Sequence, residues 1–541
     1  MSWLFVLIVI VLFASPLWGL LSQNNLNSLT SVIQDPTFLK SLKITVFSSV
    51  AAAIASVICG LLFAKQFANY TWSGKRYQRL LLLFPYLIPN FILAIAFVIS
   101  WNPTTGLLNF AFKFPFGFYG MFGMIFLFSV AHMPVAFLLF EEKIKRIDTS
   151  MREAARLSGA KAWQVFMKIE LPLLRPTMIS AIGLCFALNI SAFAIPAWIG
   201  APEHVYPLTF KIYQAIQLGG LDGLPEAASL SLVLFILALT PLVLNYFVKD
   251  EKQYAVLSGK SARLSDESQS LKSFLIFQTV FFVTQILFWM APLTCLFLST
   301  IVKPGCLQSS LQTGQLQCFA DISFSRYSYV VFDLAETKFG LQGSLIYGFA
   351  SSFIIALLSI VTLGILSQNK KQLKIVENIF SILLSTPGAI IALGLIVVCS
   401  GRYGVNLYNT PWIAVAAFVI KHMSLAFQPL RTGYTNISSS LIEAGKLSGA
   451  APWQVWRKIV LPILRPEFIG GFFLVLIPIL GELTMSVFLA SPSFRPIGTV
   501  LFDLQDYADQ ASAGALAILL IGMILILNQL SRILSNGKLG Y

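Results

Sequence analysis

Apolar runs of about 20 residues, each long enough to cross a bilayer, recur along the whole of this 541-residue chain. Hydrophobic residues make up 57% of the sequence and charged residues only 11%, which excludes an ordinary soluble enzyme. Because the runs lack the alternation of a β-barrel, we predict an all-α polytopic membrane protein. We expect twelve transmembrane helices, at about 3–21, 42–64, 80–99, 120–140, 177–199, 227–248, 273–299, 343–367, 376–399, 411–430, 467–490 and 513–532.

Lysine and arginine are distributed unevenly between the segments that join these runs. With the N-terminus inside, 27 of the 37 fall on the cytoplasmic side and nine outside, the bias that membrane proteins show. We therefore predict that both termini lie in the cytoplasm. The net charge of +14 belongs to these loops, so we expect lipid contact and no nucleic-acid partner. The run 3–21 follows no basic region, which favours a retained span over a signal peptide.

A 24-residue segment occurs twice in the chain. Residues 153–176 (EAARLSGAKAWQVFMKIELPLLRP) and 443–466 (EAGKLSGAAPWQVWRKIVLPILRP) are identical at 16 positions. Each copy lies between the fourth and fifth spans of a six-helix half, so the two halves have the same orientation. We predict a first membrane domain at 1–248, a polar cytoplasmic linker at 249–272 and a second membrane domain at 273–541.

Each copy has the pattern of two short helices joined by a turn. A serine three residues before a glutamate predicts a capping box at the start of the first helix. A glycine is expected to end that helix in the left-handed conformation, and a Leu-Pro pair to end the second helix. These residues are Ser150, Glu153, Gly159, Leu171 and Pro172 in the first copy, and Ser440, Glu443, Gly449, Leu461 and Pro462 in the second.

Two interpretations fit such a pair of amphipathic helices. The helices could lie on anionic lipid, or they could dock in a groove of a partner protein. Lipid packing explains the aromatic residues and lysines, but it does not explain a cap, a turn and a stop that are nearly identical in both halves. We therefore favour docking on a protein.

The repeated pattern E-A-A-x3-G-x9-I-x-L-P resembles the EAA loop of binding-protein-dependent ABC importer permeases. The chain is similar to fused permeases of the iron(III)/thiamine type, with two MetI-like transmembrane domains and EAA loops at 141–176 and 431–466. Gly445 replaces the third residue in the second copy, which suggests that the two docking sites are not equivalent. The pattern is filled at Glu153, Ala154, Ala155, Gly159, Ile169, Leu171 and Pro172, and at Glu443, Ala444, Gly449, Ile459, Leu461 and Pro462.

The resemblance implies a location in the bacterial inner (plasma) membrane, partners and a mechanism. Each EAA loop would dock on one of two copies of a cytoplasmic ABC ATPase subunit, and a periplasmic binding protein would deliver a solute for alternating-access import. The glutamates at 153 and 443 would contact the ATPase, cap their own helices, or do both. Because the chain has no G-x4-G-K-[ST] motif, ATP would be bound by the partner subunits, and this chain would be neither an enzyme nor a cofactor-binding protein.

Two charged residues lie inside predicted spans, Lys421 and Glu482. Such charges cost about 2.5–3.5 kcal/mol on insertion scales and are candidates for functional sites. Either the two pair with each other, or Glu482 faces the substrate pathway. Prolines at 85, 89 and 387 interrupt two other spans. They are either tolerated kinks, which is the interpretation we favour, or breaks in helices near the substrate pathway.

Two of the six cysteines, Cys306 and Cys318, share a predicted outer loop, where an oxidising compartment favours a disulfide between them. The other four cysteines lie in spans and are interpreted as small apolar residues. With three scattered histidines, we expect no metal cluster, no nucleophilic triad and no catalytic residue.

Other functions stay open from the sequence. An ion-gradient-driven secondary transporter can also have two six-helix halves, although the EAA loops argue against it. A membrane enzyme would need clustered titratable groups near one face, which the sequence lacks. Among import substrates we favour iron(III) or thiamine by analogy with the fused permeases. Phosphonates, polyamines and sulfate-like anions remain alternatives.

Overall fold

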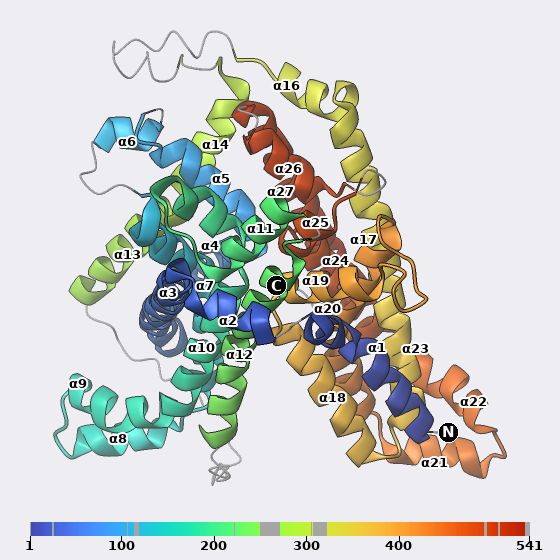
Figure 1. Cartoon of the computed structure of the whole chain (residues 1–541). Helices are drawn as coiled ribbons and strands as arrows, with labels where there is room; N and C mark the ends of the chain where they lie inside the picture. Colours follow the sequence, from blue (N-terminus) through green and yellow to red (C-terminus); the bar gives the residue numbers. More distant parts are fainter. Residues whose placement is uncertain are drawn as a thin grey trace. The chain divides into compact units, whose positions relative to one another are not determined.

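The computed structural model is built from helices (Figure 1). The residues that it describes form no β-strand, and an isolated β-bridge joins Ser400 and Asn406. The predicted all-α fold is confirmed. The predicted linker 249–272 lies almost entirely outside the described residues. These residues are 2–23, 26–104, 106–112, 118–220, 222–248, 271–303, 306, 322–491, 495–506 and 509–535.

Contacts divide the chain into two compact units, each assembled from separate stretches of sequence. The N-unit consists of Asp35–Phe210 and Ile236–Asp321. The C-unit consists of Met1–Gln34, Lys211–Phe235 and Ile322–Tyr541. The predicted division at the linker separates the two sequence repeats, whereas packing groups the helices differently.

The N-unit contains the helices of the first repeat together with a span that follows the linker. Its helices are α3 (Pro36–Asn69), α4 (Lys75–Leu87), α5 (Asn90–Trp101), α6 (Leu107–Phe112), α7 (Gly120–Lys145), α8 (Thr149–Leu157), α9 (Ala162–Val165), η1 (Phe166–Glu170), α10 (Leu171–Ser191), η2 (Pro196–Gly200), η3 (Ala201–Glu203), α13 (Leu271–Gln285), η4 (Ile286–Met290) and α14 (Ala291–Ile301).

The C-unit contains the helices of the second repeat together with the first span of the chain. Its helices are α1 (Ser2–Gln23), α2 (Leu26–Gln34), α16 (Ser325–Ser328), η6 (Tyr329–Asp333), α17 (Ala335–Leu366), α18 (Lys370–Ser385), α19 (Gly388–Val398), α20 (Pro411–Thr435), α21 (Ser439–Leu447), α22 (Pro452–Val455), η7 (Trp456–Val460), α23 (Leu461–Ile463), α24 (Arg465–Leu480), α25 (Thr484–Leu489), α26 (Ile497–Asp506) and α27 (Gln510–Leu534). Two further helices, α11 (Leu208–Gly219) and α12 (Leu224–Val248), cross the boundary between the units.

The described residues contain nine helices that are long and apolar enough to cross a membrane, and twelve spans if each of three bent helix pairs counts as one. Each of the twelve predicted spans overlaps one of them. Two predictions of a span's end are wrong: the fifth ends at Ser191 and not at 199, and the eleventh ends at Leu480 and not at 490.

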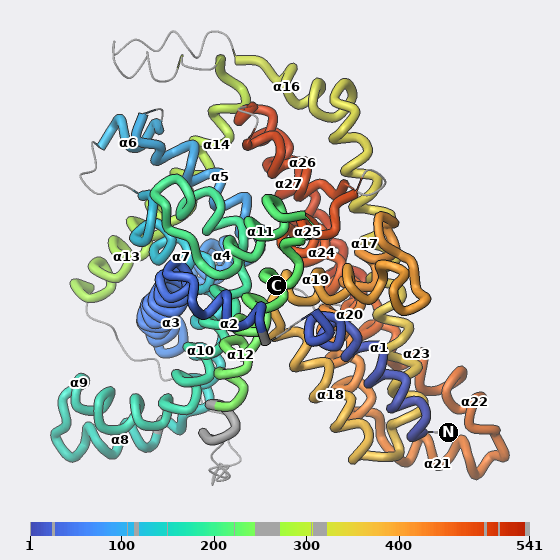
Figure 2. The backbone as a smooth tube through the Cα atoms, viewed as in Figure 1, coloured from blue at the N-terminus to red at the C-terminus, as the bar shows by residue number. Residues whose placement is uncertain are grey.

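The first span of each sequence half packs in the unit that holds most of the other half. The N-terminal helix α1 lies beside α18 and α19 (Figure 2). Its Gly19 approaches so closely that an added Cβ would stand 2.3 Å from the carbonyl oxygen of Gly394. In the N-unit, α14 packs on α5, and the preceding η4 lies against α4, where the rings of Trp289 and Phe84 are 4.7 Å apart. Small residues permit this close helix packing where no hydrophobic driving force exists.

Two spans are broken and not merely kinked, which makes the kink interpretation wrong. The α4–α5 pair bends by 95° and the α18–α19 pair by 106°. Pro89 and Pro387 each stand at the N-cap of the second helix of their pair. Pro85 is tolerated inside α4. A proline can break a helix inside the membrane where neighbouring groups form hydrogen bonds with the backbone amides and carbonyls that lose their helical partners.

Candidate functional site

The two repeated loops form the same structure in both units. Two residues past the ends of α8 and α21 lie Gly159 and Gly449, whose φ values are 82° and 77°. The amide of each glycine donates to a carbonyl three residues back, and the next amide donates to a carbonyl five residues back. This is a Schellman cap, in which glycine takes the left-handed position without steric cost. The predicted glycine turns are confirmed.

The starts of these helices differ from the predicted capping boxes. The N-cap of α8 is Asp148, whose carboxylate accepts from the amide of Ser150 at 2.9 Å. The N-cap of α21 is Ser438. The capping-box prediction at Ser150–Glu153 and Ser440–Glu443 is therefore wrong, because an N-cap residue two positions earlier already starts each helix. Both glutamates are exposed and lie past the first turn.

The Leu-Pro pairs do not end the second helices. In the first loop, Ala162–Ser191 forms one continuous helical run. A π-turn precedes the proline, so that the amide of Leu171 donates to the carbonyl of Phe166. In the second loop the amide of Leu461 donates to Trp456 in the same way, and a bend of 66° follows Ile463. The wider π-turn leaves room for the proline ring, so the helix continues past it. The prediction that the Leu-Pro pair ends the second helix is therefore wrong.

Both loops expose apolar side chains at matching positions. Leu157 and Leu447 are 91% and 89% exposed, and Trp163 and Trp453 are 61% and 60% exposed. Ala154 and Ala444 are exposed on the same short helices. Exposed apolar patches of this kind mark interaction sites. In Figure 1, α8 and α9 extend from the end of α10, and α21 and α22 extend from their own unit.

The first loop is anchored at its base by buried charges that the sequence analysis did not identify. Nε of Arg152 lies 2.9 Å from Oε1 of Glu170, and both side chains are at least 93% buried. Arg152 also donates to Oδ1 of Asn69 at 2.7 Å, and Lys65 lies 3.5 Å from the second Glu170 oxygen. The Lys65 ammonium stands 4.0 Å from the Phe166 ring centre. The cluster joins α8, the π-turn and the end of α3.

The second loop is anchored by apolar packing. Ile442 and Val460 occupy the positions of Arg152 and Glu170, 290 residues further along. Val460 is buried, and the Trp456 ring stacks on Tyr434 at 5.6 Å. A Cβ on the neighbouring Gly445 would stand 2.9 Å from the Ile459 side chain, so the glycine of this loop makes room for that isoleucine.

The model of the family described as "Binding-protein-dependent transport system inner membrane component" matches residues 56–250 and again residues 355–538. The two matches cover more than half of the chain, and each contains one repeated loop. The chain belongs to this family. It is a multi-pass inner-membrane permease with two MetI-like domains.

Relatives of this permease include ferric transport permeases that match it over most of its length. The Fe(3+)-transport system permease protein FbpB 2 of Haemophilus influenzae is 22% identical over 494 residues, covering 90% of this chain and 88% of the relative. The ferric transport system permease protein FbpB of Actinobacillus pleuropneumoniae is 22% identical, covering 83% and 64%. The inner membrane ABC transporter permease protein YcjO of Escherichia coli is 27% identical, covering 40% and 75%.

The two intramembrane charges of the permease stand at helix breaks of the C-unit. Nζ of Lys421 donates to the carbonyl of Thr386, the C-cap of α18, at 2.8 Å. Oε2 of Glu482 accepts from the amides of Met485 and Ser486 at 2.8 and 3.2 Å. In the described part of the chain the two groups make no direct ion pair. The breaks adjoin, because a Cβ on Gly388 would lie 3.4 Å from Oε1 of Glu482.

The predicted disulfide falls partly outside the described residues. Cys306 is disulfide-bonded, and Cys59, Cys185, Cys295 and Cys399 are free. Cys318 lies outside the described residues, so its pairing with Cys306 stays a prediction.

One more feature of the loops was present in the sequence and was missed. Oε1 of Gln164 accepts from the amide of Lys161 at 2.8 Å, and Gln454 accepts from Ala451 at 2.9 Å. The glutamine is thus the N3 half of a capping box at the second helix. Its repetition in both copies was the available signal.

Replacing Gly449 with alanine should loosen the second loop. The alanine would have to keep the left-handed conformation, at a cost of about 1–2 kcal/mol. We expect α21 to fray and the loop to become more sensitive to proteolysis, with asparagine at the same position having a smaller effect. The matched control is Ala450→Gly, one residue further along. Equal protease sensitivity of Gly449→Ala and the unaltered protein would contradict this account.

Proposed function

We propose that this permease imports a solute, delivered by a periplasmic binding protein, with power from two copies of a separate cytoplasmic ATPase. The observation that carries the proposal is the pair of matching exposed surfaces around Leu157 and Leu447. An amphipathic helix with an exposed apolar tip fits a groove on a partner, and two such helices fit two partner copies. On this account the loops and both termini face the cytoplasm.

Movement of the docking helices would be passed into the membrane helices. In the N-unit the buried cluster at Arg152 and Glu170 ties α8 to α3 and to the start of α10. In the C-unit, the apolar packing of Trp456 and Val460 lies at the equivalent place, at the base of the second loop. Because a packed base transmits displacement instead of absorbing it, closure of the ATPase pair would move the spans and alternate access.

We favour iron(III) as the substrate. The relatives that cover most of this chain are named for Fe(3+) or ferric transport, and they share its fused two-domain organisation. At 22% identity the likeness supports the class of solute by analogy. Thiamine and other small solutes are the alternatives that a transport assay separates.

We propose that Glu482 and Lys421 border the substrate pathway. Each is half-buried, and each binds backbone groups that a broken span leaves without helical partners. Binding sites of transporters are built from such discontinuous helices, with charged side chains near the unwound backbone. The first repeat has Ala131 and Ala192 at the corresponding positions, so the pathway would be asymmetric.

Glu482→Gln should lower substrate uptake about tenfold. The glutamine oxygen still accepts from the amide of Met485, but the charge-assisted part of the interaction, about 1.5 kcal/mol, is lost. Lys421→Met should act similarly by leaving the Thr386 carbonyl without its donor. The measurement is initial uptake rate at equal protein level, with the exposed Glu142→Gln as the matched control. Normal uptake by both variants would remove these residues from the pathway.

Reconstitution tests the function itself. The permease, its ATPase and its binding protein are placed in proteoliposomes, and uptake of chelated radioactive iron(III) is followed with ATP or a non-hydrolysable analogue. We expect uptake only with ATP and binding protein together. Uptake driven by an ion gradient without the ATPase would favour the secondary transporter. ATP-driven uptake of thiamine but not iron(III) would keep the importer and change the substrate.

A further inference from the structure

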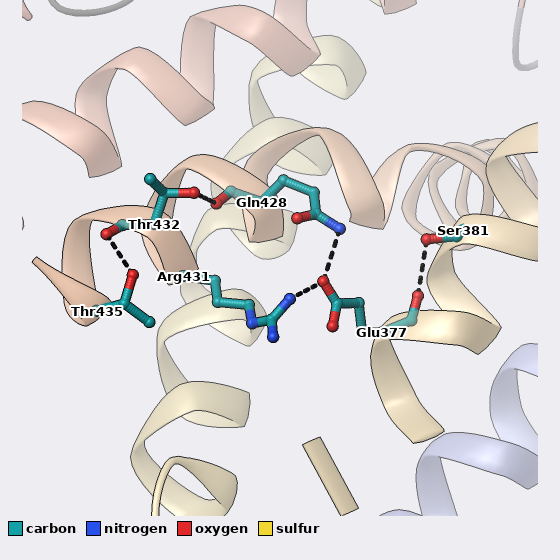
Figure 3. A network of polar contacts seen from close by, with 6 residues as sticks. All are labelled: Glu377, Ser381, Gln428, Arg431, Thr432 and Thr435. Carbon is teal, nitrogen blue, oxygen red and sulfur yellow. Dashed lines mark hydrogen bonds and ion pairs between the residues drawn. The ribbon is translucent and has the colours of Figure 1, made fainter. Parts of the chain in front are cut away.

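The two units contain the same inter-helix ion pair with its charges exchanged. In the N-unit, Nε of Arg79 on α4 lies 2.9 Å from Oε2 of Glu141 on α7. In the C-unit the acid is on the broken span and the base on its partner: Arg431 on α20 binds Glu377 on α18. Gln428 donates to the same Glu377 oxygen at 3.1 Å (Figure 3).

The positions are equivalent in the two repeats. Arg79 and Glu377 each lie ten residues before the proline that breaks their span. Glu141 and Arg431 each lie twelve residues before the glutamate of their repeated loop. In both units the pair therefore joins the cytoplasmic end of a broken span to the helix that leads into the loop.

The two helices that lead into the loops, α7 and α20, are alike around Glu141 and Arg431, because they are repeats. The sequences His-Met at 132–133 and Ala-Phe at 136–137 on α7 recur at 422–423 and 426–427 on α20. Phe137 and Phe427 are both fully buried against neighbouring helices of their own units. Apolar packing alone therefore distinguishes the right partner poorly from the corresponding helix of the other repeat.

Charge distinguishes them well. If α4 paired with α20, Arg79 would face Arg431, and if α18 paired with α7, Glu377 would face Glu141. The Glu141 side chain is only 3% exposed and that of Glu377 15%, so water screens neither group fully. Like charges brought together in such places are a strong penalty against the wrong partner.

We propose that the exchanged ion pairs are specificity determinants that direct each broken span to the helix of its own repeat while the duplicated chain folds. If both repeats carried the base on the broken span, each native ion pair would be equally stable, but a broken span could also form an ion pair with the helix of the other repeat. Because acid and base are exchanged between the repeats, a broken span that met the helix of the other repeat would face a like charge. The four residues act on partner choice, in addition to tying the loops to the spans.

The test first gives both repeats the same arrangement of acid and base, and then restores opposite arrangements. Glu377→Arg with Arg431→Glu reverses the C-unit pair, so that both repeats carry the base on the broken span. A combined variant adds Arg79→Glu and Glu141→Arg, with Lys145→Glu to keep an opposite charge beside position 141. The readouts are the fraction of membrane-inserted full-length protein recovered as a single monodisperse species, and the thermal midpoint of that species.

We expect the C-unit double variant to lose recovered fraction while the recovered species keeps its thermal midpoint, and the combined variant to regain the fraction. An unchanged fraction in the double variant would overturn the proposal, because equal polarity would then do no harm. A loss that the combined variant does not restore would also overturn it. So would a thermal midpoint that falls in parallel, since the pairs would then act only on stability.

Discussion

Replacing Leu157 and Leu447 together with aspartate is expected to release the ATPase from the detergent-solubilised complex. The two side chains are 91% and 89% exposed in this chain and lie at equivalent positions, so docking on the ATPase would bury both of them. Burying one leucine contributes about 1.5–3 kcal/mol, and each 1.4 kcal/mol is about tenfold in affinity. We expect each substitution to weaken docking at least about tenfold, and the pair to abolish co-purification.

The chain supplies a matched control for this experiment. Leu218 on α11 is 85% exposed but lies outside both loops, so Leu218→Asp should leave the ATPase bound. The glutamates offer a second test on the same helices: Glu153→Arg with Glu443→Arg should also reduce co-purification. ATPase retained by the double leucine variant, at normal permease level, would be incompatible with docking through these tips.

Glu170→Val is expected to be the most destabilising single substitution at the base of the first loop. It leaves the Arg152 guanidinium buried without its carboxylate, and breaking a buried ion pair in this way costs about 3–5 kcal/mol. Adding Arg152→Ile should recover most of that loss, because isoleucine and valine already occupy these positions at the base of the second loop, as Ile442 and Val460. The measurement is thermal unfolding of the purified permease.

Whether adding Arg152→Ile raises or lowers the stability of Glu170→Val decides between two interpretations. A double variant more stable than Glu170→Val alone means that the charges are needed together and not individually. If the double variant is less stable still, the two side chains contribute independently and the cluster is not a unit. Glu142→Val, which removes an exposed ion pair with Arg146, is the control and should change stability little.

Features of the fold that depend on local sequence were predictable. Apolar runs predicted the spans, because a helical segment that crosses a bilayer needs about 20 predominantly apolar residues. The turns at Gly159 and Gly449 followed from glycine, the residue that takes the left-handed conformation at least cost. The repeated loops were found as functional candidates because lipid packing does not explain a surface that is nearly identical in both halves.

Features that depend on distant partners were not predictable. Pro85 and Pro89 have the same chemistry, yet only the second stands at a break, since the outcome depends on what packs there. The anchoring cluster joins Arg152 to residues far away in sequence, at Lys65 and Asn69, and no periodicity indicates such a contact. The exchange of α1 and α14 between units is likewise a matter of tertiary packing.

The proposed function depends on docking of the ATPase at the two loops. A photo-crosslinking amino acid at position 157 or 447, in membranes that contain the whole transport system, shows which molecule lies against each loop. We expect a crosslink from each position to the ATPase subunit. Crosslinks only to lipid or to the periplasmic binding protein, from both positions, would contradict it.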